Sequence, residues 1–459
     1  MIRKINQEKG LYLFILLNPI LDLLSSLFKS LGFAYTPSTF LRPLLVLVIV
    51  IWIFICDKGT RKKILIAAGI YLLYAVIHLY LYNNIITGIS YGGVPYELQY
   101  LCNYTYLVFT LLSFVYVFYK QKNKLKDILF YNILFYISTI YLAIITNTSL
   151  SSYVEGTGYK GWFNTSGAVG SILVISLFIL IPYLVKREIK AIYKYSFVFA
   201  IIFYLCFLIG SRVGLLGSVL VVGFYIFLII ANYLFHNKKI NIKKYLPLIL
   251  SSLAVILITF TLFGSYTLDR RNELDEIVDD EVHIAYDLMD IKEQIDTGTI
   301  EKGYMSDEQI RALNSLYDYA NKINLPNVDL RTQQLIYHYY LYQYQDSIAL
   351  KLFGNGYLAN FGALTLEMEG IALIFNLGMI GFILFMVPFL SIFIYGVYMG
   401  IKHIKQIDVE YMMYISGIFV SYLISLLAGH VYFNTSVMPV IIIIHVLLLN
   451  KIKSLGESK

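Results

Sequence analysis

Residues 167–185 read GAVGSILVISLFILIPYLV, an unbroken apolar run without a charged side chain. Such a run is long enough for a helix to cross the roughly 30 Å hydrocarbon core of a bilayer. It does not alternate with a period of two, as a lipid-facing barrel strand would. Because backbone groups in a bilayer must be satisfied within their own segment, the stretch is predicted to be a transmembrane helix.

Similar runs recur along most of the chain. The 459 residues are 58% hydrophobic and only 14% charged, with a mean hydropathy of +0.69. Soluble domains carry about 25% charged residues, so a soluble class is excluded. We expect an all-α, polytopic integral membrane protein with about twelve transmembrane helices. The expected spans are residues 11–33, 37–56, 64–82, 98–119, 128–147, 167–185, 195–210, 213–235, 245–265, 370–396, 411–428 and 434–450.

The spans divide the chain into three regions. Residues 1–265 hold nine spans, residues 266–366 form a large polar loop with amphipathic helices, and residues 367–459 carry three spans and a tail. The chain has three cysteines, all at or inside spans, so neither a disulfide framework nor a cysteine metal site is expected.

Lysine and arginine collect in every second gap between the spans. The gap at 83–97 has neither residue, and the gap at 148–166 has only Lys160. The positive-inside rule therefore predicts that both termini are cytoplasmic and that the loop at 266–366 is extracytoplasmic. The net charge of +7 is explained by this topology and does not indicate nucleic-acid binding. The basic clusters lie at residues 3–9, 58–63, 120–126, 186–194, 238–244, 402–405 and 451–453.

The large loop is predicted to be helical. Its acidic first part, residues 269–308, is interpreted as a solvated surface, because no EF-hand spacing is present. Ser306 and Gln309 resemble a capping box, and apolar residues at helical spacing follow. A second helix is expected from about Asp329. It places Arg331, Leu335, His338 and Tyr342 on one face.

Several polar residues near the expected outer ends of spans are candidates for chemistry. Glu367 and Glu369 precede a span, where a carboxylate can serve either as a base for a sugar hydroxyl or as an N-terminal helix charge. Arg212, between two spans, can snorkel to headgroups or clamp a phosphate. His430 is either structural or catalytic. Tyr342, in a tyrosine-rich stretch, suits a membrane interface or stacking on a sugar ring.

Two glycines, Gly354 and Gly356, lie in the segment LFGNGY at 352–357. Their lack of a side chain permits a tight turn and close approach of the backbone to a ligand or a helix.

The order of these motifs resembles the O-antigen ligase and polysaccharide polymerase superfamily, in its Gram-positive, O-antigen-ligase-like branch. The resemblance covers most of the chain. It rests on Asn18-Pro-Ile-Leu-Asp22, Lys160-Gly-Trp-Phe-Asn164, Gly210-Ser-Arg-Val-Gly214, Arg331 in the large loop, Leu352-Phe-Gly-Asn-Gly356, Leu377-Gly-Met-Ile-Gly381 and Ala428-Gly-His430.

The resemblance implies a membrane-embedded glycosyltransferase of the GT-C type that uses no cofactor or obligatory metal. Its donor would be a glycan on undecaprenyl pyrophosphate, and its acceptor a sugar hydroxyl on a second lipid-linked glycan. We expect a polymerase of capsule or similar polysaccharide in the cell membrane, because richness in Ile, Lys, Asn and Tyr suggests a cell without an outer membrane. The alternatives are a ligase for another envelope acceptor, or a flippase or transporter. A flippase and a chain-length regulator are further expected partners.

The resemblance also implies roles for residues. Arg212 and Arg331 would bind the pyrophosphate, where negative charge develops. Glu367 or Glu369 would be the base, although many relatives have a histidine there, and His430 and His338 are the other candidates. Lys160, Trp162, Asn164, Gly354, Gly356 and Tyr342 would contact substrate.

Overall fold

The computed structural model describes most of the chain, and all structural statements refer to that part. The described residues are 2–33, 36–85, 93–119, 124–152, 158–185, 196, 198, 200–202, 204–206, 208–236, 246–262, 286–299, 305–323, 330–357, 365–427, 429 and 431–457. Over these ranges the regular structure is helical, and no strand longer than an isolated bridge is present.

The helices of the first half are α1 (Ile2–Ser30), α2 (Pro37–Cys56), α3 (Lys58–Asn84), α4 (Val94–Phe118), α5 (Leu125–Ile145), α6 (Ser166–Val185), α8 (Arg212–His236) and a shorter apolar helix at Leu246–Leu262. The later helices are α10 (Tyr286–Asp296), α11 (Asp307–Ile323), α12 (Leu330–Tyr344), α13 (Ile348–Phe353), α14 (Glu369–Phe385), α15 (Val387–Lys402), α16 (Val409–Leu427) and α17 (Met438–Glu457).

The all-helical, multi-pass membrane architecture is confirmed. Nine helices of the described ranges are long and apolar enough to cross a membrane, or ten if the bent pair α14 and α15 is one span. The span predicted at 195–210 lies partly outside the described residues, so the total of about twelve stays a prediction.

The apolar run at 167–185 forms α6, which lies at the centre of the bundle. Its side chains are buried almost throughout, and it packs against α5, α8, α16 and α17. An apolar helix in a membrane can face either lipid or protein, and α6 is enclosed by protein. By contrast, α3 has a largely exposed apolar surface, as expected of a helix that faces lipid.

The span expected at 370–396 is broken. Helices α14 and α15 meet at an angle of 50°, with Met386 between them and Pro388 in the first turn of α15. Proline cannot donate a backbone hydrogen bond to the preceding turn, so it favours the start of a new helix at this point.

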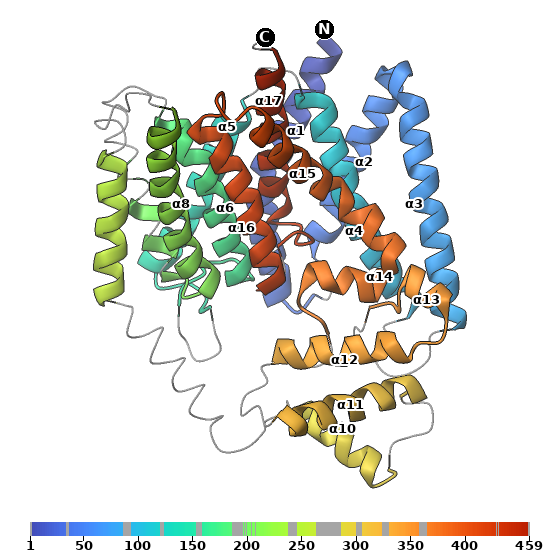
Figure 1. Cartoon of the computed structure of the whole chain (residues 1–459). Coiled ribbons are helices and arrows are strands. Elements are labelled where there is room, and N and C mark those ends of the chain that lie inside the picture. The colour runs from blue at the N-terminus through green and yellow to red at the C-terminus, as the bar shows by residue number, and fades with distance from the viewer. Residues whose placement is uncertain are drawn as a thin grey trace.

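The helices of the large loop lie at one end of the bundle. Figure 1 places both chain termini at the opposite end and shows α12 lying across the bundle, with α10 and α11 beyond it. The predicted capping box is confirmed, because Ser306 N donates to Gln309 Oε1 at 3.0 Å and Gln309 N donates to Ser306 Oγ at 3.3 Å. The apolar face of α11 packs on α12, which in turn contacts α14.

Candidate functional site

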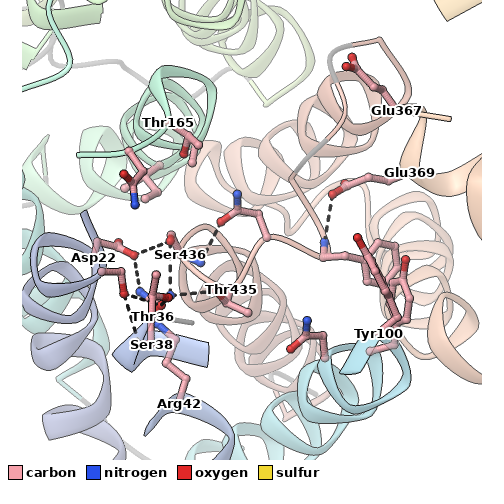
Figure 2. Close-up of a pocket in the computed structure, with 18 of the residues that line it drawn as sticks. Asp22, Thr36, Ser38, Arg42, Tyr100, Thr165, Glu367, Glu369, Thr435 and Ser436 are labelled. Atoms are coloured by element: carbon pink, nitrogen blue, oxygen red, sulfur yellow. Dashed lines mark hydrogen bonds and ion pairs between the residues drawn. The ribbon is translucent and has the colours of Figure 1, made fainter. Parts of the chain in front are cut away.

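A cavity of about 370 Å³ lies at the end of the bundle that carries α12. Its lining comes from α1, α2 and Thr36 between them, from α4, from α6 and α14 with the segments that precede them, and from the segment that precedes α17. Figure 2 shows Asp22, Arg42 and Ser436 on one side of this cavity and Glu367 and Glu369 on the other. Segments far apart in the sequence therefore build a single site.

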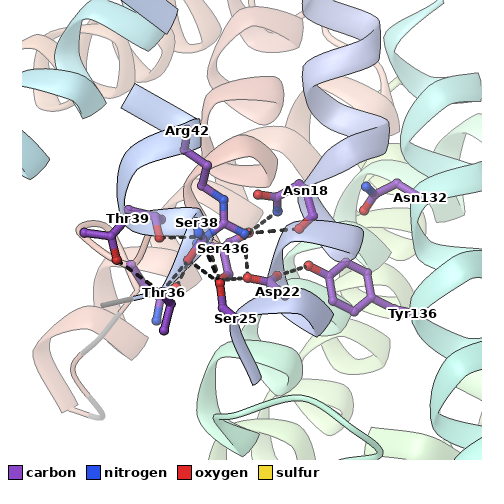
Figure 3. A network of polar contacts seen from close by, with 12 residues as sticks. Asn18, Asp22, Ser25, Thr36, Ser38, Thr39, Arg42, Asn132, Tyr136 and Ser436 are labelled. Atoms are coloured by element: carbon purple, nitrogen blue, oxygen red, sulfur yellow. Dashed lines mark hydrogen bonds and ion pairs between the residues drawn. The ribbon is translucent and has the colours of Figure 1, made fainter. Parts of the chain in front are cut away.

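A buried charge pair organises the first side of the cavity (Figure 3). The Arg42 side chain is 1% exposed, and its Nη2 lies 2.5 Å from Asp22 Oδ1. Ser436 Oγ also donates to Asp22 Oδ1 at 2.5 Å, and Tyr136 OH donates to Asp22 Oδ2 at 2.6 Å. Arg42 Nη1 donates to Thr435 Oγ1 at 2.8 Å. These bonds compensate two charges that would otherwise be costly inside a bundle, and they fix the segment 434–436.

The motif Asn18-Pro-Ile-Leu-Asp22 belongs to the same network. Asn18 and Asp22 are four residues apart on α1, so both face the same neighbour. Asn18 Nδ2 donates to Ser436 O at 2.8 Å, and Asn18 O accepts from Arg42 Nη2 at 3.1 Å. The motif thus joins the beginning of the chain to the turn before its last helix.

Glu369 holds the adjoining segment 431–433 from the other side. Its Oε2 accepts from Tyr432 N at 2.7 Å and from Ser425 Oγ at 3.0 Å, and its Oε1 accepts from Phe433 N at 3.3 Å. The residue is 8% exposed. A carboxylate whose two oxygens already accept these hydrogen bonds is suited to anchoring the backbone, and less suited to taking a proton from a substrate.

Glu367 has a different environment, although it is only two residues away. Its Oε2 accepts from Arg331 Nε at 2.8 Å, and its backbone N donates to Gln334 Oε1 at 3.3 Å. Arg331 Nη1 also donates to Leu427 O at 2.8 Å, which ties α12 to the end of α16. The Glu367 and Arg331 side chains are 35% and 38% exposed. Glu367 Oε1 makes no hydrogen bond within the described part of the chain, and the residue lines the cavity.

Comparison with known families finds a match over residues 5–455 to a family described as O-antigen ligase like membrane protein. The chain belongs to this family. Comparisons with curated proteins and with solved structures find no match. Membership confirms the resemblance drawn from the motifs, and it supports a multi-pass membrane enzyme that acts on lipid-linked glycans.

In this O-antigen ligase-like protein a second buried pair fixes the segment LFGNGY. His78 Nδ1 donates to Phe353 O at 2.6 Å, and His78 Nε2 lies 2.7 Å from Glu97 Oε1. Glu97 Oε2 accepts from Tyr357 N at 2.9 Å. The Tyr357 ring stacks on Tyr100 with centroids 3.7 Å apart, and both rings line the cavity. Burial raises the pKa of the Tyr357 phenol, which therefore stays neutral at ordinary pH.

The two glycines of this segment are needed for packing. A Cβ on Gly356 would lie 2.4 Å from the Tyr82 ring, and one on Gly354 would lie 2.2 Å from Asn376 O. Both glycines have a positive φ. The close approach predicted for them is made to neighbouring helices, and neither glycine lines the cavity.

The loop before α6 contributes one of its three predicted residues to the cavity. Asn164 lines it, whereas Trp162 donates from Nε1 to Thr148 Oγ1 at 2.9 Å. Lys160 is half-buried in the same loop. Partial burial and, secondarily, the charge of Lys29 lower the pKa of the Lys160 ammonium.

Two predicted residues of α12 pack against α14. His338 is buried with its ring centroid 5.8 Å from that of Phe375, and Tyr342 meets the same ring edge-on at 5.7 Å. The Lys351 ammonium lies over the Tyr342 ring, 5.6 Å from its centroid. Neither His338 nor Tyr342 lines the cavity.

Two further candidates stay predictions. Arg212 is the first residue of α8, but its side chain lies outside what the structure describes, and His430 lies outside the described residues altogether. Among the residues that are described, no group of three or more His, Cys, Asp or Glu is placed to hold a metal ion.

The sequence motifs include Asp22 without a role in the site, and Arg42 lies in none of them. An ionisable residue inside a span is a signal of a functional or structural site, and this signal could have found both. The segment 434–436 carries no comparable local signal, because polar uncharged residues near a span end are common.

Proposed function

We propose that this protein is a polysaccharide polymerase. It transfers a glycan from an undecaprenyl-pyrophosphate-linked donor to a sugar hydroxyl of a lipid-linked acceptor at the outer face of the membrane. The observation that carries the proposal is the environment of Glu367, whose carboxylate lines the cavity with one oxygen held by Arg331 and the other without a hydrogen bond in the described ranges. Family membership supports the substrate class, a lipid-linked glycan.

The reaction in this proposal is a single displacement. Glu367 accepts the proton of the acceptor hydroxyl while that oxygen bonds to the anomeric carbon of the donor. The bond from the anomeric carbon to the phosphate oxygen breaks, and undecaprenyl pyrophosphate leaves with the electron pair. The proton is then released from Glu367 to solvent, for which its partial exposure is suited.

Glu367 fits the role of base better than Glu369 and His338 do. Glu369 accepts two backbone N–H groups and a hydroxyl, so its oxygens are engaged in holding the segment 431–433. His338, on α12, packs against Phe375 of α14 and does not line the cavity. The choice of Glu367 also agrees with its exposure, since a base must be reached by the acceptor.

Positive charge for the leaving group is assigned to Arg331 and Arg212. Arg331 contacts Glu367, which lines the cavity, so a diphosphate beside that carboxylate would lie within reach of the guanidinium. A guanidinium can bind a phosphate through two parallel hydrogen bonds, and it stays charged at any physiological pH. Arg212 is proposed as the second cation from the sequence pattern alone.

The membrane orientation is part of the proposal. The cavity lies at the end of the bundle opposite to the termini, together with α10, α11 and α12. The lysine and arginine distribution predicts that this end is extracytoplasmic. A donor whose glycan has already crossed the membrane would thus meet the cavity from the outer leaflet.

The test uses purified full-length protein in detergent with lipid-linked glycan extracted from cells that lack this protein. We expect a ladder of longer lipid-linked glycans, which a flippase cannot produce because transport needs two compartments. Arg331→Ala and Arg212→Ala should each lower the rate of glycan transfer by about 100-fold or more.

The matched control is Arg311→Ala. Arg311 lies on α11, is 54% exposed and is paired at 3.7 Å with Glu308, so its removal should leave the rate unchanged. Absence of product with the native protein, or normal rates for the Arg331 and Arg212 variants, would refute the proposal. Glycan that appears on a different acceptor would identify a ligase.

A further inference from the structure

The charged groups that line the cavity are already compensated. Arg42 is paired with Asp22, and Glu369 accepts three hydrogen bonds from its own protein. Glu367 is paired with Arg331. Among the described lining residues Arg42 is the only cation, and three are carboxylates. The interior is therefore a poor place for a phosphate or any other anion.

Uncharged polar groups in the cavity wall, in contrast, include side-chain amides that donate no hydrogen bond to the described part of the protein. The side-chain amide nitrogens of Asn103, Asn164, Asn376 and Asn434 donate no hydrogen bond to any residue in the described ranges, and all four residues line the cavity. Asn376 is only 5% exposed. These amide nitrogens are therefore available to donate hydrogen bonds to a ligand in the cavity.

Aromatic side chains line the cavity together with these amides. Tyr100, Tyr104, Phe163 and Phe433 also line the cavity, and Tyr104 meets Phe433 edge-on with centroids 4.5 Å apart. Amides can both donate to and accept from hydroxyl groups, and aromatic faces pack on the apolar C–H face of a sugar ring. This combination matches a hydroxylated, uncharged ring.

The segment 431–436 carries part of this wall and is fixed from two directions. Glu369 holds its first residues, and the Asp22–Arg42 pair holds its last ones. Asn434 Oδ1 accepts from Ser436 N at 2.9 Å, which sets the orientation of the Asn434 amide. A recognition surface that is rigid before binding loses little entropy when the ligand arrives.

On the basis of the proposed function, we propose that the cavity is a subsite for an uncharged sugar ring of the acceptor glycan. The amides of Asn103, Asn164, Asn376 and Asn434 recognise its hydroxyls, and the diphosphate of the donor stays outside, on the Arg331 side of Glu367. The ring belongs to the acceptor because its hydroxyl must reach Glu367, which lines the same cavity. A uronic acid is excluded, since its carboxylate would face Asp22, Glu367 and Glu369 without a free cation.

The first test measures binding without turnover. Saturation-transfer NMR on the purified full-length protein compares the methyl glycosides of glucose, galactose and N-acetylglucosamine with methyl glucuronide. We expect at least one neutral glycoside to bind, and the glucuronide to bind at least tenfold more weakly. Asn103→Asp and Asn434→Asp keep the size of the side chain but replace the donor by a carboxylate oxygen, and should each weaken the neutral ligand about tenfold or more.

Asn83→Asp is the matched control. Asn83 is exposed near the end of α3 and does not line the cavity, so the same change of charge there should leave binding unaltered. Equal affinity in the cavity variants and the control, stronger binding of the glucuronide, or no binding of any neutral glycoside would overturn the proposal.

The second test separates this proposal from the proposed function. In the transfer assay the Asn103 and Asn434 variants should raise the KM for the acceptor about tenfold while changing kcat little. If product forms and these variants match the Asn83 control, the subsite is wrong and the function stands. If the native protein forms no product, the function is wrong, and the glycoside measurements still decide whether the sugar subsite exists.

Discussion

Replacing Glu367 and Glu369 by glutamine should have opposite consequences. Glu367→Gln removes the proposed base from a pair that is more than one third exposed on both sides, so screening by water limits the stability cost to below about 1 kcal/mol. The rate should fall by about 100-fold to 10,000-fold, the usual contribution of a general base. Glu367→Gln is therefore expected to be folded and inactive.

Glu369→Gln should instead destabilise the protein. An amide nitrogen placed near Tyr432 N, Phe433 N and Ser425 Oγ leaves at least one buried donor without an acceptor, which costs about 1–3 kcal/mol. The segment 431–433 should loosen, but the fraction of molecules that remains folded keeps the base. Its rate per folded molecule is expected to fall far less than that of Glu367→Gln.

Two measurements on the same preparations distinguish these outcomes. Thermal unfolding in detergent reports stability, and initial rates with extracted lipid-linked glycan report transfer, normalised to the folded fraction from size-exclusion chromatography. A Glu367→Gln rate within tenfold of the native rate would refute the assignment of the base. A Glu369→Gln protein that is fully stable yet inactive would show that the two carboxylates have been assigned the wrong way round.

Two further substitutions test the supports of the cavity. Gly356→Ala should destabilise the protein by about 1–3 kcal/mol and raise the KM for the acceptor. The reason is that the new Cβ would lie 2.4 Å from the Tyr82 ring, at a backbone φ of +77°. Unchanged thermal unfolding and an unchanged KM would contradict this packing. Arg42→Met should lower the free energy of unfolding by about 3–5 kcal/mol, because it leaves the charge of Asp22 without its cation. The double variant Arg42→Met, Asp22→Asn should recover much of that stability. Equal unfolding temperatures for the single and double variants would exclude a compensated pair.

Local sequence patterns predicted helices α11 and α12 of the large loop. The capping box at Ser306 and Gln309 depends on residues three apart, and it forms as expected. The face of α12 that carries Arg331 and Tyr342 does turn toward α14 and the segment before it. Such features depend on side-chain spacing along one helix, which the sequence states directly.

The bend between α14 and α15 was harder to predict from the sequence. An apolar run across 370–396 satisfies the hydropathy criterion whether or not it is straight. Pro388 was a signal for a new helix start, but the 50° change of direction depends on what surrounds the two helices. Hydropathy therefore locates apolar segments but does not describe the path of the helices that they form.

The sequence by itself determined that this is a helical membrane protein, and its motif order indicated the family to which it belongs. Only the tertiary structure decided what each polar residue does. Asp22 and Ser436 are 414 positions apart yet share a hydrogen bond. Glu367 and Glu369 are near neighbours in the chain yet face Arg331 and Tyr432 respectively. Hydropathy and helix spacing are local properties, whereas the environment of a carboxylate depends on which distant segments the packed helices bring beside it.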